Sequence, residues 1–376
     1  MLYAILEEIE KRHPGATVII NDNFAGIGLY KVKTRLRRII PLRLLMGDYP
    51  RALLSRLKLP HLMFTKFYPS RYVDVILDAS GFRIGDQWMK SREYLDNMAF
   101  YYKTMKKRGT KIIFLPQAFG PFESENARKS IQIVTDYADL LIAREAESEK
   151  YLLNAGADTG KVVRFPDFTN TMPGIFPEKC QSFKNGICII PNRMMMGQTG
   201  EKSRDYLDKM ASIIQHLSTY DRTLFFLNHE GKKDLDICRE LNRRFGSRFA
   251  IINGLGVKEI KGVIGASYLV ISSRYHGVAS SLNQGVPCLA TSWSHKFRLL
   301  YHDFHLDNQI IEPEEDPVTT YEKIGYLLDP VNHASTKKHL ADRAGELENM
   351  TRRMWDRVWQ VAENMGHSSA HWKNHE

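Results

Sequence analysis

The sequence predicts an α/β protein with two Rossmann-like domains, each built on a parallel sheet, that face one another across a cleft. Two observations lead to this prediction. Short apolar runs rich in β-branched residues alternate with helical patterns over most of the 376 residues, and this alternation is typical of parallel sheets covered by helices. A stretch rich in proline and glycine, MPGIFPEKC (172–180), divides the alternation into two units of similar size.

The expected strands are the apolar runs that recur along both units. In the first unit they are 17–21, 73–79, 111–117, 140–143 and 161–165. In the second unit they are 186–191, 223–229, 249–253, 268–273 and 286–291. Residues 331–365 have the pattern of a long polar helix, and 366–376 that of a frayed tail. The predicted domains are therefore 1–175 and 176–330, with a C-terminal helix and tail over 331–376.

The composition excludes several classes of protein. Hydrophobic residues make up 43% and charged residues 26% of the chain, which is the mix of an ordinary globular protein. No apolar run approaches the roughly 18 residues of a membrane-spanning helix. Three glutamates, Glu7, Glu8 and Glu10, occupy the place where a secretory signal needs its apolar core. The four cysteines form no C-x-x-C pair or metal-ligand spacing, which favours a reducing, cytoplasmic location.

The positive charge is concentrated in one segment. The formal net charge is +10, and residues 31–58 contain nine Lys or Arg against one acidic residue, Asp48. Because arginine alternates there with leucine and isoleucine, the segment suits an anionic membrane surface. A solvated helical face with buried aliphatic residues explains the pattern equally well. Charge gathered in one segment argues against nucleic-acid binding by the whole protein.

The most informative segment is ISSRYHGVASSLNQGVPCLATSWSHKF (271–297). A buried strand is expected to end at Ser273, with Arg274 and His276 at its carboxyl end and Gly277 opening a helix. The start of a helix offers backbone N–H groups and a positive dipole end, and a guanidinium beside it suits a carboxylate or phosphate. The next strand brings Lys296 to the same edge. The plainer interpretation is that Arg274 pairs with a helix end and His276 is a core histidine.

In its order of motifs, the chain resembles the polysaccharide pyruvyltransferase family. The pattern Ser-x-Arg-x-His, Gly-x-Pro and Ser-x-Lys-Phe over 272–297 carries most of the resemblance. Four further segments match in the right order, namely GFRIGDQW (81–88), LPQAFGPF (115–122), AREAESEKYLLNAG (143–156) and FPDF (165–168). The resemblance covers about residues 1 to 310. It implies a fold like that of two-domain, glycosyltransferase-B-like enzymes.

The resemblance also implies a reaction. Family members transfer a pyruvyl group from phosphoenolpyruvate to two hydroxyls of a sugar, forming a cyclic ketal. Phosphoenolpyruvate is a co-substrate, and the scheme needs no metal or other cofactor. The acceptor would be a sugar of a cell-surface or exopolysaccharide, which is often lipid-linked. Docking of 31–58 on an anionic membrane would then be useful.

Residue roles follow from the same resemblance. Arg274 and His276 would be catalytic. Ser273, Gly277, Lys296 and Arg193 would bind phosphoenolpyruvate, and His229 joins them on geometry alone, although a surface loop histidine is an equal alternative. Gly81, Gln117 and Asp167 would lie on the acceptor side, where Asp167 is open to interpretation as a turn residue.

The chain also departs from the family pattern. Family members open with a strand and a Gly-Asn-x-Gly-Asp loop, whereas this chain starts in what looks like the middle of the following helix, MLYAILEEIEKR. Either the start codon is misplaced or this is a shortened version of the family fold. We expect the first, with about 10–20 further residues upstream of Met1. Two other functions stay open, a nucleotide-sugar glycosyltransferase and a non-catalytic glycan-binding protein. Ser280 counts against the first, because many such enzymes carry a ribose-binding glutamate at that position.

Overall fold

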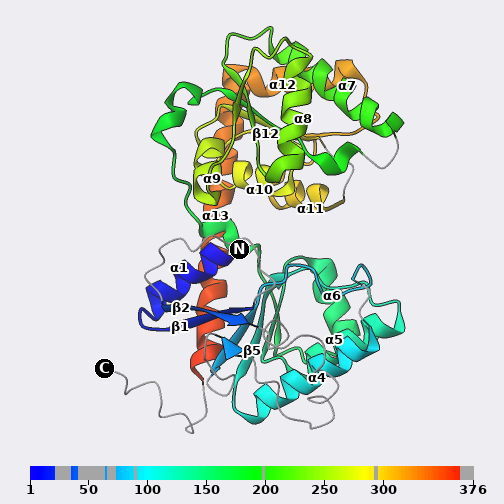
Figure 1. Ribbon diagram of the computed structural model, residues 1–376, viewed down its shortest axis with the longest axis vertical. Coiled ribbons are helices and arrows are strands. Elements are labelled where there is room, and N and C mark those ends of the chain that lie inside the picture. The colour runs from blue at the N-terminus through cyan, green and yellow to red at the C-terminus, as the bar shows by residue number, and fades with distance from the viewer. Residues whose placement is uncertain are drawn as a thin grey trace. The chain divides into compact units, whose positions relative to one another are not determined.

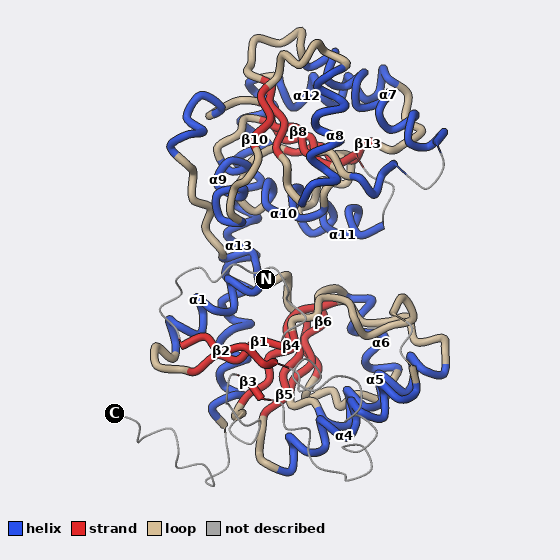
Figure 2. Tube along the Cα trace, viewed as in Figure 1, coloured by secondary structure: helices blue, strands red, loops and turns tan. Residues whose placement is uncertain are grey.

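The computed structural model describes residues 1–21, 35–40, 64–65, 73–88, 91–196, 200–291 and 295–364. The chain forms two compact units (Figures 1 and 2). Unit 1 contains residues 1–172 and 349–376, and unit 2 contains residues 173–348. Of the basic segment 31–58, only the backbone of 35–40 lies within the described residues, so the membrane and helical-face interpretations of that segment remain predictions.

The described residues of unit 1 form two sheets. The first has the order β1-β2-β3, in which β1 and β2 are parallel and β3 is antiparallel to β2. The second is parallel and has the order β4-β5-β6-β7. The strands are β1 (Thr17–Asn21), β2 (Arg35–Ile40), β3 (Phe64–Thr65), β4 (Val75–Asp78), β5 (Lys111–Gln117), β6 (Leu140–Ala143) and β7 (Val162–Arg164).

Amphipathic helices pack on the parallel sheet of unit 1. They are α1 (Leu2–Arg12), α4 (Arg92–Lys107), α5 (Glu125–Tyr137) and α6 (Ala146–Asn154). Serine hydroxyls cap two of them, since Ser91 accepts from the backbone of Tyr94 and Ser124 from that of Ala127. The inner strand β5 is buried from residue 112 to its end, which is why it appears in the sequence as a nearly continuous apolar run.

Unit 2 is built on one parallel sheet of six strands. Its order is β10-β9-β8-β11-β12-β13. The strands are β8 (Ile187–Ile190), β9 (Leu224–Leu227), β10 (Ala250–Ile252), β11 (Leu269–Ser272), β12 (Cys288–Thr291) and β13 (Ile310–Ile311). From β8 the chain builds outward in one direction through β9 and β10. It then returns to the other side of β8 and builds outward through β11, β12 and β13.

The helices of unit 2 follow its strands in alternation. They are α7 (Gly200–Leu217), α8 (Gly231–Arg243), α9 (Val257–Gly265), α10 (Tyr275–Leu282), α11 (His295–Asp303), α12 (Pro317–Leu328) and α13 (Pro330–Glu363). All four cysteines are buried free thiols in this unit. Within the described residues, no helix has the length and apolar character needed to cross a bilayer.

The long C-terminal helix belongs to both units. Residues 330–348 of α13 lie in unit 2, where His333 and His339 hydrogen-bond to the carbonyls of Tyr268 and Phe304. Residues 349–363 lie in unit 1, where Trp355 and its apolar neighbours join the core around α1 and β5. The unit boundary therefore lies at Met172 and Pro173, and the expected separate C-terminal segment is divided between the two units.

The fold class predicted from the sequence, two α/β domains with parallel sheets, is confirmed. Each of the ten expected strands is present, with ends that differ by at most two residues. Three strands were not expected, the short β3 and β13 and the basic β2. Strand β2 has the sequence RLRRII, in which arginines obscure the apolar alternation.

Candidate functional site

The candidate site lies in unit 2 at the carboxyl ends of β8 and β11. These strands are neighbours, but the chain continues from them to opposite sides of the sheet. Ligands of open α/β sheets bind at such a reversal of strand order. Arg193 follows β8, Arg274 follows β11 and His229 follows β9. Three side chains expected from the sequence therefore come from the same edge of the sheet.

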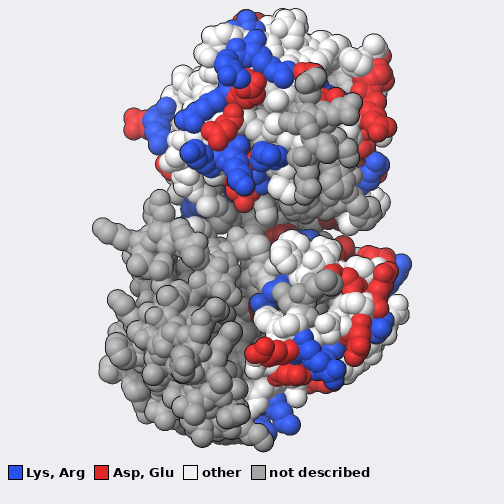
Figure 3. All heavy atoms as spheres, turned by 45° about the vertical axis from the view of Figure 1, so that its right-hand side comes forward, with Lys and Arg blue, Asp and Glu red and all other residues white. Residues whose placement is uncertain are grey.

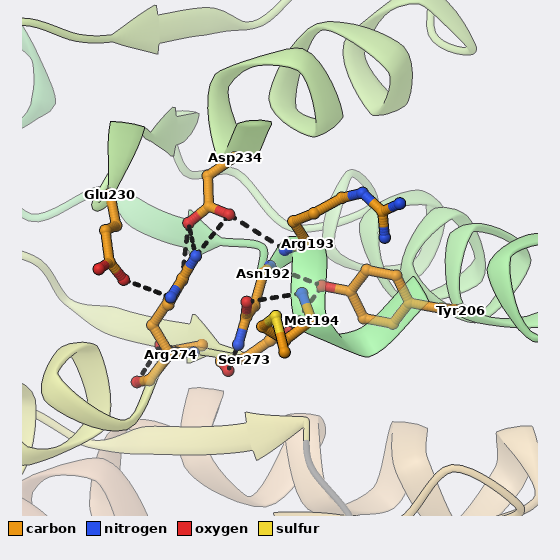
Figure 4. Close-up of polar contacts among 9 residues, drawn as sticks. Asn192, Arg193, Met194, Tyr206, Glu230, Asp234, Ser273 and Arg274 are labelled. Atoms are coloured by element: carbon orange, nitrogen blue, oxygen red, sulfur yellow. Dashed lines mark hydrogen bonds and ion pairs between the residues drawn. The ribbon is translucent and has the colours of Figure 1, made fainter. Parts of the chain in front are cut away.

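Ser273 fixes the end of β11. Its backbone N–H donates to the carbonyl of Ile190 at 2.8 Å, and its own carbonyl accepts from Asn192 Nδ2 at 2.9 Å. Its hydroxyl lies 2.7 Å from Tyr206 Oη (Figure 4). The same hydroxyl lies 2.5 Å from Thr291 Oγ1. Ser273 is fully buried. Its partner Tyr206 is buried as well, and this burial raises the pKa of the Tyr206 hydroxyl to about 12. The structure thus makes Ser273 a support for the next residue, Arg274.

The guanidinium of Arg274 is held in a two-pronged ion pair. Arg274 Nε and Nη2 donate to Asp234 Oδ2 and Oδ1, both at 2.6 Å, and Nη1 contacts Glu230 (Figure 4). Asp234 has no exposed surface, whereas the Glu230 side chain is 68% exposed. Burial opposes the charge of Arg274, but the two carboxylates outweigh it and raise its pKa. This geometry is the rigid fork that arginine forms with a carboxylate.

Asp234 also ties down the loop after β8. The backbone N–H of Arg193 donates to Asp234 Oδ1 at 3.0 Å. The Arg193 guanidinium, however, points away from Asp234 and Arg193 is exposed (Figure 4). Asp234 lies in the first turn of α8, where a carboxylate also suits the positive end of the helix dipole. One buried carboxylate therefore connects β8, β11 and α8.

Helix α10 begins two residues earlier than the sequence analysis expected. It starts at Tyr275, with Arg274 as N-cap residue, so Gly277 lies inside the first turn and does not open the helix. A Cβ at Gly277 would lie 2.5 Å from Ser272 Oγ and 3.2 Å from Ile190 Cδ1. Glycine is needed at this position because the helix packs directly against the ends of β8 and β11. Arg274 makes no side-chain capping bond to the helix it precedes.

Two histidines lie close to Arg274. His276 is exposed on α10, and its ring packs edge-on against Tyr275 at a centroid distance of 5.6 Å. His229 has a buried Nδ1 with no hydrogen-bond partner in the described structure. Burial, together with the positive charges of His276 and Arg274, lowers the pKa of His229 to about 4. His229 is therefore neutral near pH 7, and its unpaired nitrogen is a group that a ligand could satisfy.

Lys296 falls in the first turn of α11, but its side chain is outside the described part of the chain. Its participation in the site remains a prediction.

In the part of the chain that the structure describes, no group of three or more His, Cys, Asp and Glu side chains could hold a metal ion. Figure 3 shows Lys and Arg side chains gathered on one face of unit 2, with some Asp and Glu among them.

Two of the residues expected on the acceptor side come together in unit 1. Gly81 has a φ of +81°, and its carbonyl accepts from the backbone N–H of Ala118 at 2.9 Å. Gln117 is fully buried at the end of β5, where its Oε1 accepts from Ser80 Oγ at 2.9 Å. Among the described residues, its Nε2 has no hydrogen-bond partner. A buried donor without a partner at the carboxyl end of a parallel strand fits a ligand-binding position.

Asp167 has a local structural role. Its Oδ1 accepts from Thr169 N at 2.9 Å and from Thr169 Oγ1 at 2.7 Å, which caps the short 3₁₀-helix over Phe168–Thr171. Its other oxygen lies 3.7 Å from Arg144 Nη1. The backbone N–H of Arg144 donates to the carbonyl of Gln117 at 3.1 Å, so Asp167 is connected to Gln117 through Arg144.

Sequence reasoning missed the carboxylates that hold Arg274. Asp234 and Glu230 follow strand β9 in LNHEGKKD, so their place after a strand that ends at this edge was the available signal. An isolated acidic residue in the first turn of a helix is usually a dipole partner, and nothing local distinguishes Asp234 from that case.

The loop after β4 also presents two exposed aromatic rings, Phe82 and Trp88, with centroids 5.6 Å apart.

Comparison with known proteins gives a family match over most of the chain. The model of the family described as "Polysaccharide pyruvyl transferase" matches residues 1–295. No curated protein matches the sequence.

Solved structures with a similar fold include three proteins that cover at least nine tenths of the chain. HepE from Anabaena, crystallised with UDP-glucose, has a TM-score of 0.56 at 12% identity, with 95% of each chain covered. A putative UDP-N-acetylglucosamine 2-epimerase from Listeria monocytogenes has a TM-score of 0.59 at 13% identity, covering 95% of this chain and 92% of its own. The UDP-GlcNAc 2-epimerase from Neisseria meningitidis has a TM-score of 0.58 at 10% identity, with 96% of each covered. These similarities establish the glycosyltransferase-B-like fold.

Proposed function

The chain belongs to the polysaccharide pyruvyl transferase family, and we propose that it transfers a pyruvyl group from phosphoenolpyruvate to two hydroxyls of a glycan. The observation that carries the proposal is the edge of unit 2 where the Arg274 fork stands beside the exposed imidazole of His276. An oriented guanidinium suits the carboxylate or phosphate of the donor. An imidazole exchanges protons near neutral pH.

The reaction requires two proton transfers at this edge. A proton added to the methylene carbon of phosphoenolpyruvate makes a methyl group and leaves C2 with oxocarbenium character. One sugar hydroxyl adds to C2, the bond from C2 to the phosphate oxygen breaks, and the second hydroxyl closes the ketal. The two hydroxyl protons balance the one gained by carbon and the one gained by the departing phosphate. We propose His276 as the acid and then the base, because its ring is accessible to a ligand.

The donor's negative charge needs more than Arg274. The exposed guanidinium of Arg193 and the ammonium of Lys296 are the further cations in this proposal. The neutral His229 would offer the donor a hydrogen bond. Its Nδ1, which has no partner among the described residues, is one of the two ring nitrogens available for it. Ser273 and Gly277 contribute by setting the position of Arg274 and α10, as their contacts describe.

The acceptor would be recognised in unit 1. Gly81 and Gln117 bring a fixed loop and an amide donor, unpaired within the described part of the chain, to the same strand ends. The exposed rings of Phe82 and Trp88 lie on that loop, and an aromatic face is a surface on which a sugar ring can stack. Asp167 would act indirectly, because it lies 3.7 Å from the guanidinium of Arg144, whose backbone N–H donates to the carbonyl of Gln117. The acceptor class is a cell-surface polysaccharide or exopolysaccharide sugar.

Phosphoenolpyruvate is made in the cytoplasm, so the proposal includes a cytoplasmic location. A lipid-linked acceptor would bring the enzyme to the membrane surface, and residues 31–58 are the proposed contact. Co-sedimentation with anionic and with neutral vesicles tests this contact. Binding to anionic vesicles that weakens with salt supports it, and equal salt-independent binding to both kinds would refute it.

The decisive test of the function is a titration of the purified chain with phosphoenolpyruvate, UDP-glucose and UDP-N-acetylglucosamine. Binding of phosphoenolpyruvate, followed by phosphate release when a glycan acceptor is added, supports pyruvyl transfer. Binding of a UDP-sugar alone would favour a nucleotide-sugar transferase. Ser280 supplies no carboxylate for a ribose, so we expect the first result. Binding of glycan without either donor would indicate a non-catalytic protein.

A further inference from the structure

The two carboxylates on Arg274 differ in how firmly they are held. Asp234 is completely buried and accepts three hydrogen bonds, two from the Arg274 guanidinium and one from the Arg193 backbone. It lies inside the first turn of α8. Because Asp234 is shielded from solvent, water cannot replace the guanidinium as its partner. Asp234 is therefore a permanent partner of Arg274.

Glu230 is held only loosely. Its side chain is 68% exposed, and among the described residues its carboxylate contacts no other hydrogen-bond or ion-pair partner than Arg274 Nη1. It is the N-cap residue of α8 but makes no capping bond, and Gly231 follows it with a φ of +70°. An exposed ion pair of this kind adds little to stability. Glu230 can therefore leave Arg274 at low cost, with water taking its place.

The position of Glu230 is the one that a substrate anion needs. Asp234 occupies Nε and Nη2 from the buried side, so Nη1 is the part of the guanidinium turned towards the exposed side chain of Glu230 (Figure 4). A carboxylate or phosphate that binds Arg274 must therefore compete with a carboxylate already there. The charges agree with this, because one guanidinium faces two carboxylates and a further anion would be repelled while Glu230 stays.

We propose that Glu230 is a displaceable internal carboxylate that fills the anion position of Arg274 until the substrate's own carboxylate or phosphate replaces it. Asp234 is the positioning residue that keeps the guanidinium aimed during the exchange. The inference rests on the proposed function for the identity of the anion, phosphoenolpyruvate. Glu230 sets the affinity threshold of the site, since only a ligand that binds Arg274 better than Glu230 does can enter.

The two carboxylates should then have opposite effects on binding. Glu230→Gln removes the competing charge and should lower the Kd for phosphoenolpyruvate about 2- to 5-fold, in line with a partly exposed charge pair. Asp234→Asn removes the partner that orients the fork and should raise the Kd by about tenfold or more. A purely structural role for both residues would weaken binding in both variants or in neither.

The experiment is calorimetric titration of the full-length chain with phosphoenolpyruvate and, separately, with inorganic phosphate. Matched controls lie on the same helix, since Glu240→Gln and Asp236→Asn make the same chemical changes at carboxylates paired with Arg243 and Arg239. Thermal unfolding checks that each variant is folded. Should Asp234→Asn fail to fold, Asp234→Glu takes its place, because it keeps the charge and misplaces the carboxylate.

Tighter binding by Glu230→Gln alone, with weaker binding by the Asp234 variant and unchanged controls, supports the proposal. Unchanged or weaker binding by Glu230→Gln overturns the displacement role, and unchanged binding by a folded Asp234 variant overturns the positioning role. If the wild-type chain binds UDP-glucose or phosphate but not phosphoenolpyruvate, the proposed function fails. In that case the Kd values of the Glu230 and Asp234 variants are measured with the anion that does bind. Shifts of the two Kd values in opposite directions still support the role of Glu230, and shifts in the same direction overturn it.

Discussion

Replacing Arg274 with alanine should destabilise unit 2 as well as weaken donor binding. The variant removes both 2.6 Å bonds to Asp234 and leaves that buried carboxylate with the Arg193 N–H as its remaining described partner. Breaking one side of a buried ion pair costs about 3–5 kcal/mol. The Arg274 side chain is 18% exposed, so water can enter where it stood. We therefore expect a loss at the low end, about 3 kcal/mol.

The effect on the donor is a separate quantity. Arg274 has one nitrogen, Nη1, available to an incoming anion once Glu230 leaves. Loss of a charge-assisted hydrogen bond costs about 1.5–3 kcal/mol, which corresponds to a roughly 10- to 150-fold higher Kd for phosphoenolpyruvate. Arg274→Lys should recover little of either loss, because an ammonium cannot bond to both oxygens of Asp234 and to an anion in the same geometry.

Urea unfolding followed by circular dichroism measures the stability, and calorimetry measures the Kd. Arg239→Ala is the matched control, since it removes an arginine that is 61% exposed and pairs with Asp236 on the surface of α8. That control should lie within about 0.5 kcal/mol of the wild type. An Arg274→Ala variant as stable as the control, or one that binds phosphoenolpyruvate with wild-type affinity, would refute the reasoning.

Three further predictions follow from neighbouring residues. His276→Ala and His276→Asn should both bind phosphoenolpyruvate yet release phosphate about 10²- to 10⁴-fold more slowly, and a near wild-type rate in His276→Asn would exclude proton transfer by this ring. Gly277→Ala should cost about 1–3 kcal/mol in urea unfolding because its Cβ meets Ser272 Oγ at 2.5 Å. Its control Gly345→Ala, in open space within α13, should gain up to about 1 kcal/mol. Burial lowers the pKa of His229 from 6.5 to about 4 in the folded chain. As the pH falls between those two values, the unfolded chain binds a proton that the folded chain does not, so the free energy of unfolding of the wild type falls by up to about 3 kcal/mol. His229→Gln lacks this loss, and identical pH–stability curves for the two proteins would contradict the assignment.

The sequence predicted the parallel strands well because burial on both faces makes each of them a continuous apolar run. Strand β11 is an example, since all four of its residues are buried and its run stands out between polar segments. The start of α10 was predicted two residues late, because Gly277 was interpreted as a helix opener. Its packing against Ser272 and Ile190 depends on the neighbouring strand β8, which no local pattern reports.

The site was predicted in part for a similar reason. Arg274 and His276 stand together in the sequence, and a motif within a few residues can mark them. Asp234 reaches Arg274 across 40 positions of sequence, from a helix on another strand–helix unit. Such a pair follows from the sheet order, which places β9, β8 and β11 side by side. Sequence reasoning located the cation but had no means of identifying the carboxylates that hold it.

The missed carboxylates change the charge balance of the site. Counted from the sequence alone, Arg274 is a positive charge offered to an anion. In the structure its charge is matched by buried Asp234, and the exposed Glu230 adds a further negative charge. Even after Glu230 is displaced, the Arg274–Asp234 pair is neutral overall and contributes direction, in the form of an aimed N–H group, more than attraction. The net attraction for a donor that carries both a carboxylate and a phosphate must then come from other groups. One of them is the exposed Arg193, which follows the neighbouring strand β8. Variants of Arg193 should accordingly change the salt dependence of donor binding, whereas variants of Asp234 should change its geometry.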